Sequence, residues 1–76
     1  MRTSIYIAVR GGSVQGVRLD KDRKDKNPND IADCYVVDYD NFDNGDGEFA
    51  TVSDFERDAL GGRTWKTIER TSKAVW

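Results

Sequence analysis

The chain has 76 residues, 37% of them hydrophobic and 34% charged, and its formal net charge is −2. This length predicts one domain, residues 1–76, with a small core and no room for a deep substrate pocket. The chain has one cysteine and no histidine, which excludes an internal disulfide, a histidine-activated nucleophile and a zinc cluster. Its first residues resemble neither a signal peptide nor a membrane span, so we expect a cytoplasmic protein.

The charges are distributed unevenly along the chain. Residues 1–26 carry a net charge of +4, residues 27–60 carry −9, and residues 61–76 carry +3. Because local potential steers partners more than total charge does, this segregation is the first indication of how the protein is recognised.

Residues 4–10 have the period of a β-strand, because Ile5, Ile7 and Val9 alternate with the side chains between them. These branched side chains favour a strand and define an apolar face. We expect the helical part of the chain to cover this face.

The glycine pair at 11–12 supplies the positive φ angles of a tight turn, and so predicts an antiparallel hairpin with a return strand at 13–19. Gly16 interrupts the return strand and indicates a bulge. Residues 20–30 are charged, contain the only proline and lack apolar side chains, so they predict an exposed loop.

Residues 31–40 predict a third strand with apolar side chains on both faces. Cys34 and Val36 share one face, and Tyr35 and Val37 share the other. A strand that is apolar on both faces is typical of the centre of a sheet. We therefore expect this strand to be central and Cys34 to be a small buried residue.

Residues 51–62 have the signature of a helix. Ser53, with Glu56 three residues later, forms a capping-box pattern, and Phe55 lies on the apolar face. The glycines at 61–62 end the helix.

The tail, residues 63–76, fits either a helical face or a strand, and a helix is the preferred interpretation. Together the elements predict an α+β domain. It has a small antiparallel sheet of about three strands, with one or two helices packed on one face.

The segment DYDNFDNGDGEF, residues 38–49, concentrates acidic residues without a basic one. It has three interpretations: a metal-binding loop, a solvated loop or a recognition surface. The EF-hand spacing fails with either Gly45 or Gly47 at the sixth position, because residues that are poor ligands then occupy ligand positions. We therefore expect no metal site and no cofactor. Without a catalytic group or a walled cleft, we also expect no enzymatic activity.

Two segments, AVRGGSVQGV (8–17) and YVVDYDN (35–41), resemble a pattern of very small, mostly uncharacterised proteins from bacteria and their mobile elements. In that pattern a VRGGxVQxV hairpin is followed by a short loop and a VxVxDYDN strand end. The resemblance implies a compact sheet-and-helix domain without known catalytic residues. The segments 20–30 and 42–48 are longer and more charged than the pattern, and residues 63–76 have no counterpart in it.

The predicted function is that of a non-enzymatic inhibitor whose acidic surface mimics nucleic acid and occupies a basic, nucleic-acid-binding surface of a host defence complex. In size, acidity and lack of catalytic residues the chain resembles small phage-encoded anti-CRISPR proteins. We expect a monomer or small homo-oligomer with no direct contact to nucleic acid or membrane. The expected partner-binding residues are the acids of this region and two aromatics among them: Asp38, Tyr39, Asp40, Phe42, Asp43, Asp46, Glu48, Asp54, Glu56 and Asp58.

Two alternatives stay open. In the first, the basic segments 18–26 and 63–73 meet in a nucleic-acid-binding patch. In the second, the chain is an accessory subunit whose tyrosines and tryptophans dock on a larger protein. The cations of the first segment are Arg18, Lys21, Arg23, Lys24 and Lys26.

Overall fold

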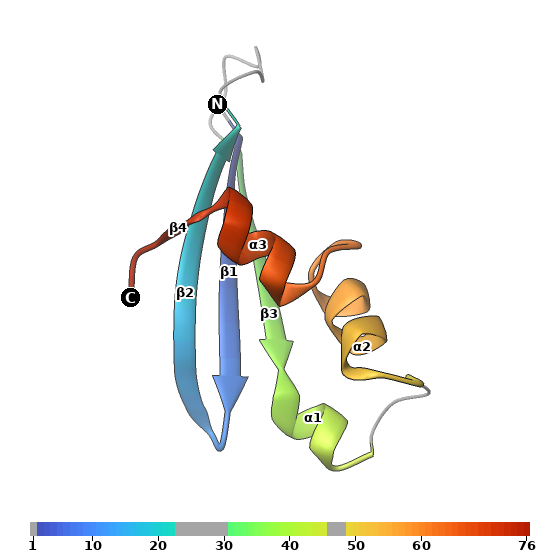
Figure 1. Ribbon diagram of the computed structural model, residues 1–76. Coiled ribbons are helices and arrows are strands. Elements are labelled where there is room, and N and C mark those ends of the chain that lie inside the picture. The colour runs from blue at the N-terminus through green and yellow to red at the C-terminus, as the bar shows by residue number, and fades with distance from the viewer. Residues whose placement is uncertain (1, 23–30, 46–48) are drawn as a thin grey trace.

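The computed structural model describes residues 2–22, 31–45 and 49–76 (Figure 1). Within these ranges the chain forms a four-stranded mixed sheet and three helices, which confirms the α+β class. None of the described helices is long and apolar enough to cross a membrane. The elements in chain order are β1 (Arg2–Arg10), β2 (Ser13–Asp22), β3 (Ile31–Asp38), α1 (Tyr39–Asp43), α2 (Val52–Ala59), α3 (Trp65–Thr71) and β4 (Lys73–Ala74).

β1 and β2 form the predicted antiparallel hairpin. Gly11 and Gly12 make its turn at φ angles of 64° and 71°, a region that residues with a Cβ rarely adopt. The glycine pair therefore fixes where the chain reverses, and with it the register of the two longest strands.

The predicted bulge lies next to Gly16. The register shifts between Ala8, which pairs with Gly16, and Val9, which pairs with Val14. Gln15 is therefore the extra residue, and its side-chain amide donates a hydrogen bond to the Arg10 carbonyl at 3.1 Å. A bulge at this point adds twist to the end of the hairpin without changing which side chains share a face.

The sheet order is β3-β1-β2-β4, so β1 and β2 are central and β3 lies at an edge. β3 runs parallel to β1, with Tyr35 opposite Tyr6, whereas β4 is antiparallel to β2. The predictions of three strands, an antiparallel sheet and a central third strand are therefore wrong. The apolar pattern of β3 has another cause: one face packs on helices, and the other belongs to a bare apolar surface described below.

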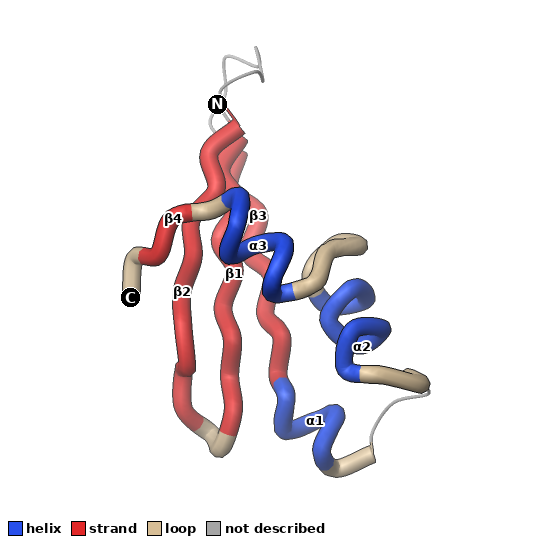
Figure 2. The backbone as a smooth tube through the Cα atoms, in the orientation of Figure 1, coloured by secondary structure: helices blue, strands red, loops and turns tan. Residues whose placement is uncertain are grey.

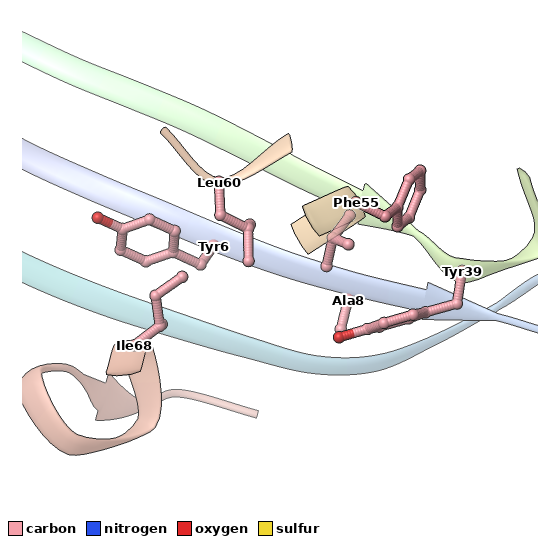
Figure 3. Close-up of a cluster of buried hydrophobic side chains, with 7 residues drawn as sticks. Tyr6, Ala8, Tyr39, Phe55, Leu60 and Ile68 are labelled. Carbon is pink, nitrogen blue, oxygen red and sulfur yellow. The ribbon is translucent and has the colours of Figure 1, made fainter. Parts of the chain in front are cut away.

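All three helices contribute to a core on one face of the sheet. From the sheet, Tyr6, Ala8 and Val37 are at most 3% exposed. Figure 2 shows α1 continuing from the end of β3 and α3 crossing in front of the sheet. Figure 3 shows the side chains that the helical layer places against these strands: Tyr39, Phe55, Leu60 and Ile68.

The helices cover the face opposite to the one expected. Ile5, Ile7 and Val9 lie on the uncovered side and are only partly buried. Both faces of β1 are apolar, so alternation alone does not say which of them meets the helices. The small side chain of Ala8 leaves room for Tyr39 to lie against the sheet, which the branched residues of the other face would not.

α2 begins two residues earlier than predicted. Its N-cap is Thr51, whose hydroxyl accepts a hydrogen bond from the Asp54 backbone N–H at 3.1 Å. The cap predicted at Ser53 is therefore wrong, because two overlapping segments share the spacing of a hydroxyl and an acid three residues later. The predicted end is confirmed, since Gly61 and Gly62 have φ angles of 69° and 90°.

The tail contains both a helix and a strand. Thr64 caps α3, and Ile68 of this helix is fully buried. Trp65 lies over the sheet where Gly16 leaves space, since a Cβ there would come within 3.4 Å of the indole. β4 then pairs with the outer edge of β2, so the preferred interpretation as a helix holds for only part of the tail.

Candidate protein-binding surfaces

The predicted partner-binding residues gather where α1 and α2 meet. Phe55 of α2 joins the two helices, since its ring centroid lies 5.6 Å from that of Phe42 and 6.4 Å from that of Tyr39. Asp46 and Glu48 lie outside the described residues. The structure therefore brings the described acids into one region, but it gives them different environments.

Asp40 fastens α1 to the hairpin turn. Its carboxylate accepts hydrogen bonds from the backbone N–H groups of Gly11 and Gly12 at 2.8 and 2.9 Å. These two bonds hold the pKa of Asp40 below its usual range. Asp38 acts nearby as the N-cap of α1, accepting a bond from the Asp40 N–H at 3.1 Å. Both acids have structural roles in this fold.

Glu56 is the polar link between the three helices. Its carboxylate accepts a hydrogen bond from the Tyr39 hydroxyl at 2.6 Å and one from the Trp65 backbone N–H at 3.2 Å. Burial and the bond to Glu56 raise the pKa of Tyr39 far above its ordinary value, so the phenol stays protonated and remains a donor. Tyr39 is 9% exposed, which leaves little of it for a partner.

The remaining described acids of the region are presented to solvent. Asp43 forms an ion pair with Arg10 at 3.3 Å, and Asp54 forms one with Arg57 at 3.3 Å. Both pairs are about half exposed and so contribute little to stability. Asp58 is exposed on the last turn of α2. We call Asp43, Asp54 and Asp58 the acidic end.

A second group of basic residues lies away from the acidic end, on β2, α3 and β4. Arg18 serves the fold, since its guanidinium donates to the Ser72 hydroxyl at 2.8 Å and to the Ser72 carbonyl at 2.9 Å, at the end of α3. Arg23, Lys24 and Lys26 lie outside the described residues. The exposed cations here, which we call the basic side, are Lys21, Lys66, Arg70 and Lys73.

A third surface, which the sequence interpretation missed, is the uncovered face of the sheet. Its members follow from the strand register: residues paired directly across two strands share a face. Cys34 lies here and is exposed, so the prediction that it is buried is wrong. We call this surface the outer sheet face; it consists of Thr3, Ile5, Ile7, Val9, Val14, Val17, Leu19, Lys21, Ala32, Cys34, Val36, Asp38, Lys73 and Val75.

One signal in the sequence could have indicated this face. Strand β1 has apolar side chains at every position from Ile5 to Val9, and helices on one side account for only half of them. Once β3 is placed at an edge, the other half has no described element to cover it.

The described residues offer little chemistry. They contain no group of three acidic or cysteine side chains placed to hold a metal ion. An open depression between β2, α3 and β4 is lined by Leu19, Asp20, Lys21, Thr71, Ser72, Lys73 and Val75. The Ser72 hydroxyl there accepts a bond from Arg18 and donates one to the Ile68 carbonyl, so it serves the fold. The absence of enzymatic activity stays a prediction.

Comparisons with protein-family models, curated proteins and solved structures gave no match. The resemblance to small proteins of bacteria and mobile elements therefore stays a prediction. Function has to be argued from the surfaces themselves.

Proposed function

We propose that this protein is a non-enzymatic, anti-CRISPR-like inhibitor that docks its acidic end on a basic, nucleic-acid-binding surface of a host defence complex. The observation that supports the proposal is the spatial separation of charge. The charge blocks of the sequence become an acidic end at α1 and α2 and a basic side at α3 and β4. A molecule with this polarity approaches a cationic groove in one preferred orientation.

Some of the predicted partner-binding residues already form hydrogen bonds within the fold. Asp38, Asp40 and Glu56 bond within the fold, so they position the helices instead of facing a partner. Asp43, Asp54 and Asp58 are left as the described carboxylates that a cationic surface meets first. They are held on two short helices that pack against one another through Phe55, so little ordering is needed on binding.

The test measures DNA binding by a panel of purified RNA-guided defence complexes, with and without this protein, at several salt concentrations. Inhibition should weaken as salt rises, because the contact is electrostatic. The double variant Asp54→Lys, Asp58→Lys should lose inhibition. The matched control, Lys66→Glu with Arg70→Glu, reverses two charges on the basic side and should inhibit normally. Full activity of the acidic-end variant would overturn the proposal.

The choice of variants follows from the hydrogen bonds. Reversal of Asp40 would break its two bonds to the hairpin turn and so mix a loss of folding with a loss of binding. Asp54→Lys removes the acceptor of a bond that the Thr51 hydroxyl donates at 2.9 Å at the start of α2, and neither Asp54→Lys nor Asp58→Lys touches the hairpin turn or the core. A thermal melt of each variant shows whether the fold is kept.

A second function is favoured by the basic side. Lys66 and Arg70 are one helical turn apart on exposed positions of α3, and Lys73 follows on β4. Such a cluster would bind phosphate backbones. A mobility shift with plain duplex and single-stranded DNA separates the two functions: strong binding that is lost in the Lys66→Glu, Arg70→Glu variant would favour this second function.

A further inference from the structure

The outer sheet face is apolar across its centre and carries polar side chains only at its margins, at Thr3, Lys21, Asp38 and Lys73. A sheet with one face in water normally alternates apolar and polar residues along its strands. Here Ile5, Ile7 and Val9 on β1 lie between Val17 and Leu19 on β2 and Val36 on β3. A contiguous apolar surface of this kind marks a contact with another molecule.

The even surface of this face is better suited to packing against another sheet than against a helix. On the covered face, Tyr6 and Ala8 alternate large and small, and Gly16 leaves a recess that Trp65 fills. The outer face carries branched side chains of similar size in successive rows, and among them Val14 and Val36 are 39% and 48% exposed. Even rows of branched residues are what two sheets use when they pack face to face.

Charges at the two ends of the face indicate what the second sheet is. Lys21 pairs with Thr3 at one end of β1, and Asp38 pairs with Val9 at the other. A two-fold axis that runs across the strands reverses their direction. It therefore places the Lys21 end of one copy over the Asp38 end of the other, twice in each dimer, with Lys21 on β2 and Asp38 on β3 at opposite sides of β1. Lys73, opposite Leu19 on β4, lies at the margin of the interface.

The area of the face is sufficient for a modest interface. From Thr3 to Val9 the strand spans about 20 Å, and four strands span about 19 Å, which gives a footprint of about 400 Å² per copy. Two copies together would cover about 800 Å², which is below the range of standard specific interfaces and typical of weak association, so we expect a dissociation constant in the upper micromolar range. Val75, which is 52% exposed, extends the face along β4.

We propose that the outer sheet face packs against the same face of a second copy of this chain, forming a two-fold symmetric sandwich with antiparallel strands across the interface. The acidic end belongs to the helical layer, as do Lys66 and Arg70 of the basic side, so both copies still present them. Lys21 and Lys73 lie on the outer sheet face, at the margin of the interface. The proposal is independent of the function proposed above, and its test uses the purified protein alone.

Analytical ultracentrifugation over about 5 to 500 µM should show a shift from monomer to dimer for the native chain. Val36→Lys places a charge halfway along β3, beside Ile7, and should keep the chain monomeric over this range. Val52→Lys is the matched control: Val52 is 40% exposed, as an apolar residue on α2 in the helical layer, and this variant should dimerise as the native chain does. A native chain that is monomeric at 500 µM would overturn the proposal, as would equal effects of the two substitutions.

Cys34 gives a second, independent measurement. The thiol is exposed in the single copy and lies on the outer sheet face, so a sandwich dimer covers it. Its rate of alkylation by a small maleimide should fall about three- to sixfold between the two concentration limits in the native chain, and stay constant in Val36→Lys. A dimer that leaves Cys34 fully reactive would have formed elsewhere, for example edge to edge through β3, and would contradict the proposal.

Discussion

The two faces of strand β1 carry side chains of the same class and have different surroundings. Tyr6 and Ala8 are 3% exposed beneath the helices, whereas Ile5, Ile7 and Val9 are only partly buried on the outer sheet face. The two faces differ in the shapes of their side chains and in whether polar atoms at the ends of those side chains find hydrogen-bond partners. The Tyr6 ring stacks on Tyr35 at 5.3 Å while its hydroxyl accepts a bond from Arg63 at 3.2 Å.

This contrast shows that hydrophobicity determines which residues are buried, whereas the shape of the surface determines which element or partner packs against them. Small residues at Ala8 and Gly16 let side chains from α1 and α3 approach the sheet. The outer face has no such recess, so it offers a surface for a flat partner. The predictions below test how strongly the two faces differ.

The largest loss of stability is expected for a substitution at the centre of the covered face. Phe55 contacts the rings of Tyr39, Phe42 and Phe49 and is 9% exposed. Phe55→Ala should cost about 3–5 kcal/mol of the free energy of unfolding, because it leaves a cavity between α1 and α2. Denaturant melts measure this value, and a loss below about 1 kcal/mol would mean that α2 does not dock as described.

A direct comparison of the two faces uses the same substitution on each. Ile68 is fully buried in the helical layer, and Ile7 is partly buried on the outer face. Ile68→Ala should cost about 2–5 kcal/mol, and Ile7→Ala about 1–2 kcal/mol, because Ile7 loses less contact in the single copy. The melts are made at low protein concentration. Equal costs would mean that the outer face is already covered in the monomer.

The covered face also depends on one polar link. Glu56→Ala removes the acceptor of the Tyr39 hydroxyl and the Trp65 N–H, which should cost about 1–3 kcal/mol. Asp58→Ala, two residues along the same helix, is the matched control and should change stability by less than about 0.5 kcal/mol. If the two variants melt alike, Glu56 does not hold the helices together.

The smallest effect is expected at Asp40, and it depends on pH. The two hydrogen bonds from the hairpin turn hold the folded-state pKa of Asp40 below that of an unfolded aspartate, so its contribution to stability is present above the unfolded pKa and is lost as the pH falls through the folded pKa. The melting temperature of Asp40→Asn should therefore lie below that of the native chain at pH 7, and the gap should narrow towards pH 3. Asp58→Asn is the control. A gap that widens in acid would contradict the hydrogen bonds to the hairpin turn.

Local sequence patterns predict where the hairpin turns and where α2 ends, but they do not predict how the strands pair. The turn at Gly11 and Gly12, and the end of the helix at Gly61 and Gly62, are set by backbone conformations that few residues adopt, so both predictions are confirmed. The parallel pairing of β3 with β1 depends on contacts far apart in the chain, and no local pattern encodes them.

The candidate site shows the same division. The sequence predicts that acids gather near α1 and α2, because they are neighbours along the chain. It does not distinguish Asp40 and Glu56, whose hydrogen-bond partners are far away in sequence or on another helix, from Asp58, which faces solvent. Only tertiary geometry separates an acid that holds the fold from one that a partner meets.

The attachment of β4 has a consequence for the motions of the molecule. The last strand is held to β2 at Arg18 and Leu19, and beyond them the Val75 N–H donates to the Val17 carbonyl at 3.0 Å and the Val17 N–H to the Trp76 carbonyl at 3.4 Å. The tail can therefore detach without disturbing the core, and each detachment turns β2 into a second free edge. Amide hydrogen exchange should reveal this local opening, with Val17 exchanging through a low-energy opening of the tail and the amides of β1 exchanging only when the whole sheet unfolds.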